Sequence, residues 1–185
     1  MTIFRIGSRP PPSFDDPVGV LDACHRRIEE RLATLERALA ALPAHEALAI
    51  LGEVVRHFDT AVVRHTEDEE HSLFPRLERA PAGDPLGSAQ RGAERSGALL
   101  IAELEAEHRA AEAIYLAFRT VAERVAAEPG LTGELESHAA ALCAAYRAHI
   151  AREEAELFPR ARALAPAELR AVGIEMRLRR GGGEP

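Results

Sequence analysis

Residues 65–77 of the chain read HTEDEEHSLFPRL, and residues 149–161 read HIAREEAELFPRA. Seven of these 13 positions are identical, and the two copies lie 84 residues apart. The segments before them also correspond, because HRRIE at residues 25–29 matches HRAAE at residues 108–112 with an offset of 83. A nearly constant offset over two segments indicates an internal duplication. The sequence therefore predicts two similar halves related by a pseudo-twofold axis.

The composition indicates that both halves are helical. Of the 185 residues, 46% are apolar but only 4% are aromatic, and residues that favour helices, such as Ala, Leu, Glu and Arg, are abundant. Apolar residues recur at helical spacing. Pro43 and Pro129 stand at expected helix ends, and Pro75 is expected to end or kink its helix. The predicted helices cover residues 16–42, 44–74, 98–127, 131–159 and 166–179.

Four long helices with short first and third connections predict an all-α fold. The expected architecture is an up-down-up-down four-helix bundle of two duplicated helical hairpins, with a short extra C-terminal helix. We expect an extended lead-in over residues 1–15, the bundle over 16–163, and the C-terminal helix with a frayed tail over 164–185. The Pro-, Gly- and Ser-rich stretch 80–97 is the longest break and joins the two hairpins.

Charge and hydropathy argue against several classes of protein. The net charge of −7 is unlike that of a nucleic-acid-binding protein, which needs a basic surface. No run approaches the ~18 apolar residues that a membrane span requires, and the N-terminus has no apolar run suited to secretion. Two cysteines, Cys24 and Cys143, are too few for a disulfide scaffold. We therefore expect a cytoplasmic protein without nucleic-acid or membrane partners.

The repeat places a histidine and a glutamate on the same side of a helix. His65 and Glu69 are four residues apart, as are His149 and Glu153. This spacing brings two side chains within ~40° of each other, one turn apart. A leucine follows four residues further on in both copies, so the stripe faces the core. A His and a Glu are costly to bury there unless something binds them.

Two more histidines complete a candidate ligand set. His25 and His108 lie at matching positions of the preceding helices, next to apolar residues. The two halves then offer four imidazoles and two carboxylates, which suit iron or manganese and also bind zinc. Divided by the pseudo-twofold axis, the set provides two metal positions with both carboxylates bridging. The predicted metal ligands are His25, His65, Glu69, His108, His149 and Glu153.

Ordinary structural roles are the alternative for these residues. The His–Glu pairs also fit exposed pairs one helical turn apart, and His25 and His108 also fit buried structural histidines. Glu29 and Glu112 follow those histidines by four residues. They are either ligands, acceptors for an imidazole or solvent-exposed residues, and the exposed position is favoured. Tyr146 fits a phenol near the metals or a core residue equally well.

The order of these motifs resembles a known family. A His, then His-x-x-x-Glu, then a His, then His-x-x-x-Glu, with Leu-Phe-Pro after both paired motifs, is similar to the hemerythrin-like proteins of the HHE cation-binding type over residues 16–163. The resemblance implies a four-helix bundle with a non-haem di-iron centre. It implies that the six residues are the iron ligands, with Glu69 and Glu153 bridging, and that O₂ or a related small molecule binds there.

One departure from the family pattern bears on function. Oxygen-carrying hemerythrins use five histidines, whereas this chain offers four well-placed ones. This argues against reversible O₂ carriage, unless water, another carboxylate or Tyr146 completes the shell. We expect two iron ions as the cofactor, with manganese or zinc as substitutes. Ferritin-like storage is disfavoured, because those sites use Glu-x-x-His motifs.

Three functions remain open from the sequence. The first is a cytoplasmic di-iron protein that binds or senses O₂, peroxide or nitric oxide and passes a signal to a protein partner. The second is an enzyme, either a di-iron oxidase or peroxidase, or the iron–sulfur repair activity of a related branch. That branch adds a cysteine-bearing N-terminal segment, and residues 1–15 contain no cysteine. The third is a metal-stabilised helical module that docks to a partner without binding gas.

Overall fold

The computed structural model describes residues 13–42, 44–79 and 97–182, and within these ranges it contains helices and no strand. None of the helices in these ranges is both long and apolar enough to cross a membrane. The all-α prediction is confirmed. In chain order the helices are α1 (Pro17–Leu39), α2 (His45–His57), α3 (Val63–Asp68), α4 (Phe74–Arg79), α5 (Gly97–Ala122), α6 (Thr132–Arg152), α7 (Phe158–Arg162) and α8 (Pro166–Arg179).

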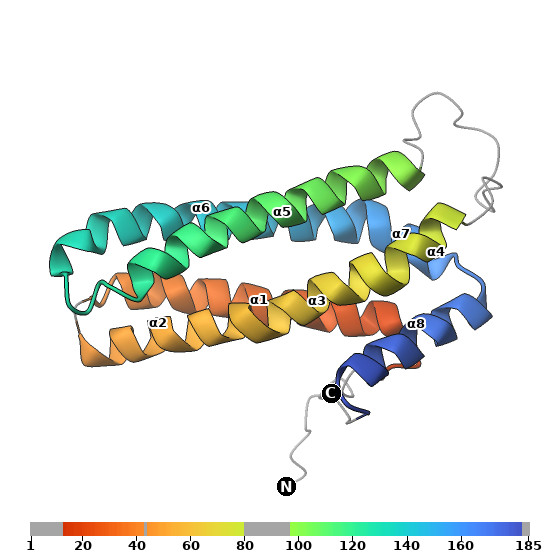
Figure 1. Cartoon of the computed structure of the whole chain (residues 1–185), viewed down its shortest axis with the longest axis horizontal. Helices are drawn as coiled ribbons and strands as arrows, with labels where there is room; N and C mark the ends of the chain where they lie inside the picture. Colours follow the sequence, from red (N-terminus) through yellow and green to blue (C-terminus); the bar gives the residue numbers. More distant parts are fainter. Residues whose placement is uncertain (1–12, 43, 80–96, 183–185) are drawn as a thin grey trace, which may run out of the picture.

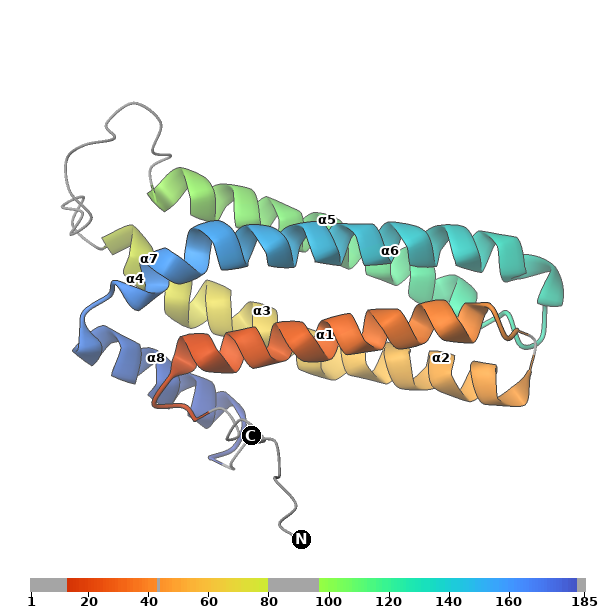
Figure 2. The same cartoon turned by 180° about the vertical axis from the view of Figure 1, so that it is seen from behind.

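The bundle has four long helices (Figure 1). They are α1, the continuous run from α2 to α4, α5, and the continuous run of α6 and α7. Consecutive long helices run antiparallel, which confirms the predicted up-down-up-down order. We call residues 17–79 the first hairpin and residues 97–162 the second hairpin. The hairpins pack through α1 against α6 and through α4 against α5, and the view from behind shows α1 beside α6 (Figure 2).

Both repeat motifs contain a π-helical turn. In the first hairpin η2 (Glu69–Leu73) joins α3 to α4, and in the second η4 (Glu153–Leu157) joins α6 to α7. Each turn begins at the paired glutamate and ends just before Phe-Pro. A proline lacks an N–H, and its ring needs room against the preceding turn, which the wider π turn provides. The second helix therefore passes Pro75, which the sequence predicted as its end or kink, and reaches Arg79.

Other helix ends follow the sequence in part. Asp16 caps α1 as predicted, because its Oδ1 accepts a hydrogen bond from the Gly19 N–H at 2.9 Å. A further π turn, η1 (Phe58–Val62), joins α2 to α3. The third helix ends at Ala122 rather than at the predicted Ala127, and turns lead from it to the short η3 (Pro129–Leu131). Pro43, the stretch 80–96 and most of the expected lead-in lie outside the described residues.

The core consists of two apolar clusters with a polar layer between them. One cluster includes Ile28 and Phe118, and the other includes Leu21 and Phe158. His25 is fully buried on α1 between Leu21 of one cluster and Ile28 of the other. The candidate ligands therefore lie in a layer of the bundle between the two apolar clusters.

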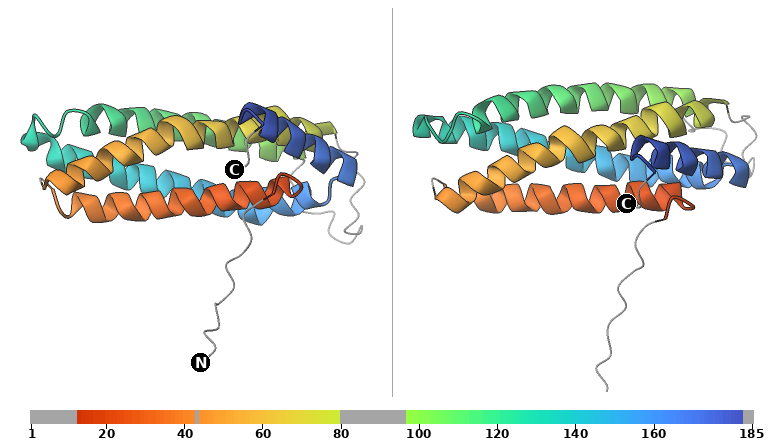
Figure 3. Two further views of the ribbon diagram at one scale, coloured as in Figure 1. Left: turned by 90° about the horizontal axis from the view of Figure 1, so that it is seen from below. Right: turned by 60° about the horizontal axis from the view of Figure 1, so that its bottom comes forward.

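The C-terminal helix α8 packs across one end of the bundle, against α1 and α3 (Figure 3). Val172 and Met176 are fully buried in the core cluster at that end. Gly173 lies so close to the backbone before α1 that an added Cβ would be 1.9 Å from the carbonyl oxygen of Phe14. Only glycine permits this approach, so α8 and the start of α1 fit tightly together.

A buried ion cluster also joins α8 to the first hairpin. Asp68, at the end of α3, is 0% exposed and pairs with Arg179 and Arg180 of α8. Arg179 also donates to Ser72 Oγ in η2. The residue after Asp68 is Glu69, so α8 holds the segment that carries a candidate metal ligand.

Candidate metal centre

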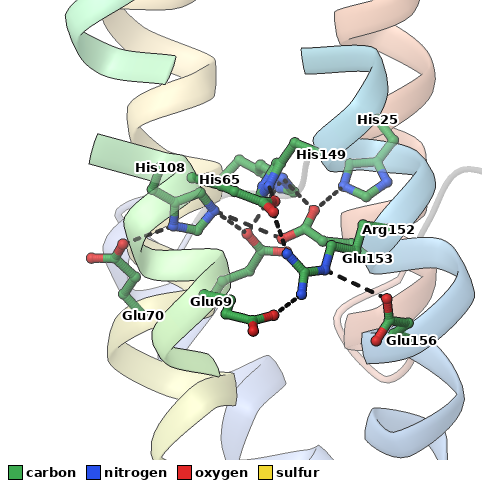
Figure 4. A network of polar contacts seen from close by, with 11 residues as sticks. His25, His65, Glu69, Glu70, His108, His149, Arg152, Glu153 and Glu156 are labelled. Atoms are coloured by element: carbon green, nitrogen blue, oxygen red, sulfur yellow. Dashed lines mark hydrogen bonds and ion pairs between the residues drawn. The ribbon is translucent and has the colours of Figure 1, made fainter. Parts of the chain in front are cut away.

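The structure brings the six predicted ligands together in the middle of the bundle, with their side chains pointing toward one another (Figure 4). They form two groups that share Glu69 and Glu153, and within each group one ligand atom from every residue lies within 4.8 Å of the others. Site A consists of His25, His65, Glu69 and Glu153, and site B consists of Glu69, His108, His149 and Glu153. Both carboxylates are therefore placed to bridge two ions.

Each shared carboxylate faces an imidazole of both sites. Oε2 of Glu153 lies 3.0 Å from Nε2 of His25 in site A, and its Oε1 lies 3.1 Å from Nε2 of His149 in site B. Oε2 of Glu69 lies 3.5 Å from an imidazole of site A and 3.4 Å from one of site B. The π turns begin at these two glutamates, so the widened backbone is at the centre itself.

The polar atoms at the centre fit a metal better than they fit one another. The Nε2 atoms of His25, His108 and His149 and the oxygens of Glu69 and Glu153 are buried and make no hydrogen bond of good geometry, although the facing atoms lie 3.0 to 3.7 Å apart. Buried polar atoms without a well-directed hydrogen bond cost free energy. Imidazole nitrogens and carboxylate oxygens are ligands that iron, manganese and zinc accept. The donor set and its geometry therefore suit a two-metal site.

In two of the imidazoles Nδ1, the ring nitrogen that points away from the centre, contacts a carboxylate from the opposite hairpin. Nδ1 of His25 contacts Glu154 at 3.1 Å, and Nδ1 of His108 contacts Glu70 at 2.7 Å. Such an acceptor fixes the tautomer that turns Nε2 toward a metal. This role was not predicted from the sequence, although both residues are the second glutamate of the repeated Glu-Glu pair.

The other two imidazoles differ from each other. Nδ1 of His149 contacts Glu107 at 2.9 Å, and Glu107 in turn pairs with Arg152. Nδ1 of His65 is buried and makes no hydrogen bond. No repeat signal marks Glu107, because the matching position of the first hairpin is Cys24.

The phenylalanines of the repeated Leu-Phe-Pro also serve the centre. The ring of Phe158 stacks on His25 with centroids 5.0 Å apart, and the ring of Phe74 stacks on His108 at 5.9 Å. Each phenylalanine thus lies against a ligand from the other hairpin. This contact explains why both copies of the motif carry an aromatic residue there.

Burial and facing charges shift the pKa values at the centre. Burial opposes protonation of His108, but the carboxylates of Glu153 and Glu69 outweigh it and raise the pKa of His108 to about 11. Burial, together with the charge of Glu153, raises the pKa of Glu69 to about 7. Burial also opposes ionisation of Glu153, but the facing imidazoles hold its pKa well below the usual range. For His65, burial and the charge of His25 lower the pKa. A cation that binds here must therefore compete with protons.

The residues left open by the sequence lie outside both sites. Tyr146 is buried and packs edge-on against Phe58, with ring centroids 5.0 Å apart. Glu29 is 40% exposed and lies 3.2 Å from Arg147, and Glu112 is exposed. Glu112 is thus exposed at the rim of the centre, Glu29 is half-exposed and paired with an arginine, and Tyr146 belongs to the core beside the centre.

The remaining histidines and both cysteines are also outside the two groups. His45 and His71 are exposed, His138 lies 3.7 Å from Glu134, and His57 packs edge-on against its neighbour Phe58. Burial raises the pKa of both thiols, that of Cys143 to about 11. The thiols are therefore protonated near neutral pH.

A cavity of about 390 Å³ opens beside the centre. Three ligands, His65, His108 and His149, contribute to its wall. The rest of the wall has an apolar part, which includes Ile28, Phe58, Val62, Ala111, Tyr115, Tyr146 and Ile150, and a charged part, which includes Asp59, Glu67, Glu70, Arg109, Glu112 and Arg119. A small molecule in this cavity lies next to both sites.

Comparison with known proteins agrees with this geometry. Residues 16–161 match the hemerythrin HHE cation binding domain, which covers all four long helices and excludes α8. No curated protein matches the chain significantly. The match spans most of the sequence and contains all six residues of sites A and B. The chain therefore belongs to the hemerythrin HHE cation-binding family.

Proposed function

We propose that this protein is a cytoplasmic non-haem di-iron protein that binds or senses O₂, peroxide or nitric oxide. The observation that carries the proposal is the pair of buried His₂Glu₂ groups that share two carboxylates and adjoin a cavity. Two adjacent iron ions, when bound, supply redox chemistry and open coordination positions for a small ligand. Manganese or zinc are alternative occupants of the same ligand set.

The residues of the chain have separate tasks in this proposal. Glu69 and Glu153 hold both metal positions at once, because each faces imidazoles of sites A and B. Glu70 and Glu154 orient one imidazole in each site. The cavity places apolar side chains and four carboxylates, those of Asp59, Glu67, Glu70 and Glu112, beside the ligands, which favours a small uncharged molecule over an anion.

The experiment is metal analysis and spectroscopy on one sample. Protein purified without added metal should contain close to two iron ions per chain. Reduced anaerobically and then exposed separately to O₂, nitric oxide and peroxide, it should change its near-ultraviolet and visible absorption with at least one of them. The double variant His65→Ala/His149→Ala should lose both iron and absorption, whereas His138→Ala, which changes a half-exposed histidine of α6 outside both sites, should keep them.

Two results would contradict the proposal. One is a colourless protein that binds no iron under any condition. The other is a double variant that retains the metal. If metal removal lowers stability while none of the three small molecules changes the spectrum, the chain is instead a metal-stabilised helical module for a protein partner.

A second candidate is catalysis at the same centre by a di-iron oxidase or peroxidase. The size of the cavity favours it, since about 390 Å³ is more than a diatomic molecule fills. Turnover of peroxide with a small phenolic reductant by the iron-loaded protein, lost in His65→Ala/His149→Ala, distinguishes catalysis from sensing.

A further inference from the structure

The pseudo-twofold symmetry of the centre is broken at one contact. His25 and His108 occupy matching positions, and both hold a glutamate on the outer nitrogen, at 3.1 and 2.7 Å. His65 and His149 also match, but only His149 has such a partner, Glu107 at 2.9 Å. The Nδ1 of His65 is buried with no hydrogen bond at all. Site B therefore has two oriented imidazoles, and site A has one.

The sequence records the cause of this difference. With the offset of 83 residues between the first helices, Glu107 corresponds to Cys24. The thiol of Cys24 is only a weak hydrogen-bond acceptor, so it does not replace the carboxylate of Glu107. With the offset of 84 between the second helices, Arg152, which pairs with Glu107, corresponds to Asp68.

The two hairpins also differ at the matching positions of Arg152 and Asp68, which carry opposite charges and bind different partners. In the second hairpin Arg152 pairs with Glu103 and Glu107 of α5, so the ion cluster ends on an imidazole. In the first hairpin Asp68 instead pairs with two arginines of α8, Arg179 and Arg180. The counterpart of Glu103 is the apolar Val20. In the first hairpin this position therefore binds α8 instead of orienting a histidine.

An outer acceptor strengthens a metal–imidazole bond in two ways. It makes the imidazole a better electron donor, and it removes the ring's freedom to rotate before the metal binds. Loss of such a partner typically lowers metal affinity by about 10- to 100-fold. From the contacts of the four imidazoles we infer that the two metal positions are unequal, with site B filling first and holding its ion more tightly than site A, and that Glu107 is the positioning residue responsible.

This inference rests on the proposed two-metal function and goes beyond it, because it assigns an order of loading and an exchangeable position. The ion at site A is the one that leaves first and that a chelator removes first. A chain with one ion therefore holds it between His108 and His149.

The test is titration of the metal-free protein with Co²⁺ by calorimetry under anaerobic conditions. Wild type should bind two ions in two steps. Because the ions share Glu69 and Glu153, their repulsion alone separates two steps, so the variants decide the matter. Glu107→Ala should weaken the first step by about 10- to 100-fold and bring it close to the second.

Glu103→Ala is the matched control. Glu103 also pairs with Arg152, but it is Glu107 that faces Nδ1 of His149, so the Glu103 variant should keep both steps of the wild type. Far-ultraviolet circular dichroism verifies that both variants are folded. If Glu107→Ala leaves the first step unchanged, or if Glu103→Ala weakens it equally, Glu107 has no orienting role and the inference is wrong.

A second pair of variants tests the order without relying on Glu107. His65→Ala removes a ligand of site A and should keep the tight first step, whereas His149→Ala removes a ligand of site B and should leave only a weak one. The opposite result would overturn the order of loading. If wild type binds no Co²⁺, the metal centre itself fails; if it binds two ions while both histidine variants lose affinity equally, only the inequality fails.

Discussion

The ion cluster between α3 and α8 predicts that the substitution Asp68→Asn destabilises the protein when both arginines are present and stabilises it when they are absent. Asp68 is 0% exposed, whereas Arg179 and Arg180 keep 21% and 15% of their side chains exposed. If the arginines are removed, the carboxylate stays buried without a counter-charge. If the aspartate is removed, the arginines still reach water. The two ways of breaking the cluster should therefore not be equal.

The magnitudes follow from the burial. Removing the partners of a buried charge costs about 3–5 kcal/mol, so Arg179→Ala/Arg180→Ala should lose that much of a total stability that is typically about 5–15 kcal/mol. Asp68→Asn alone should cost less, about 1–3 kcal/mol, through lost charge-assisted hydrogen bonds. In the background without the two arginines, Asp68→Asn should instead stabilise the protein by about 1–3 kcal/mol, because it removes an unpaired charge.

The assay is urea unfolding of the metal-free protein at pH 7 and constant ionic strength, since bound metal would add its own stabilisation. Arg170→Ala, an exposed arginine on α8, is the control and should lie within about 0.5 kcal/mol of the wild type. The reasoning is refuted if Asp68→Asn destabilises the protein by the same amount in both backgrounds. In that case the arginines do not neutralise Asp68.

Three further predictions concern protons and one hydrogen bond. Because the pKa of His108 is about 11, loading with Co²⁺ at pH 7 should release at least one proton; calorimetry in buffers of different ionisation enthalpy measures it, and an identical heat in every buffer contradicts it. Because the pKa of Glu69 is raised to about 7, the Glu69 carboxyl binds more protons in the folded metal-free chain than in the unfolded chain between pH ~4.5 and ~7. The stability that protonated Glu69 contributes is thus present at low pH and lost as the pH rises to 7. The unfolding free energy of the wild type minus that of Glu69→Gln should therefore fall over this range. If this difference rises or stays constant, the raised pKa of Glu69 is wrong. Tyr115→Phe removes a hydroxyl that donates to Asp59 at 2.7 Å and lies 3.1 Å from the Val55 carbonyl; thermal unfolding should show a loss of about 1–2 kcal/mol, and an unchanged midpoint would mean that water replaces both contacts.

Much of this centre was predictable because a metal site in a bundle is a matter of spacing. The four-residue step from His65 to Glu69 fixes a common face, and the repeat supplies the same face again at His149. The roles of Glu70 and Glu154 were also encoded, since the repeat contains both glutamates of each pair. Interpreting only the first of each pair as a ligand left the second without a function.

The rest depends on geometry that a regular helix does not describe. A period of 3.6 residues cannot anticipate the π turns, which let the chain pass Pro75 and turn Glu70 toward the other hairpin. Glu107 stands out only once its neighbour across the bundle is known. The anchoring of α8 depends on Asp68, a residue that in sequence resembles any charged position of an exposed helix.

The crossing of ligands between the hairpins has a mechanical consequence. Site A takes three ligands from the first hairpin and Glu153 from the second, while site B takes three from the second and Glu69 from the first. An ion in either position then cross-links the two halves of the chain, as a disulfide would. A chelator removes this cross-link, as a reductant removes a disulfide. The free energy of metal binding is in this sense also a free energy of closing the bundle.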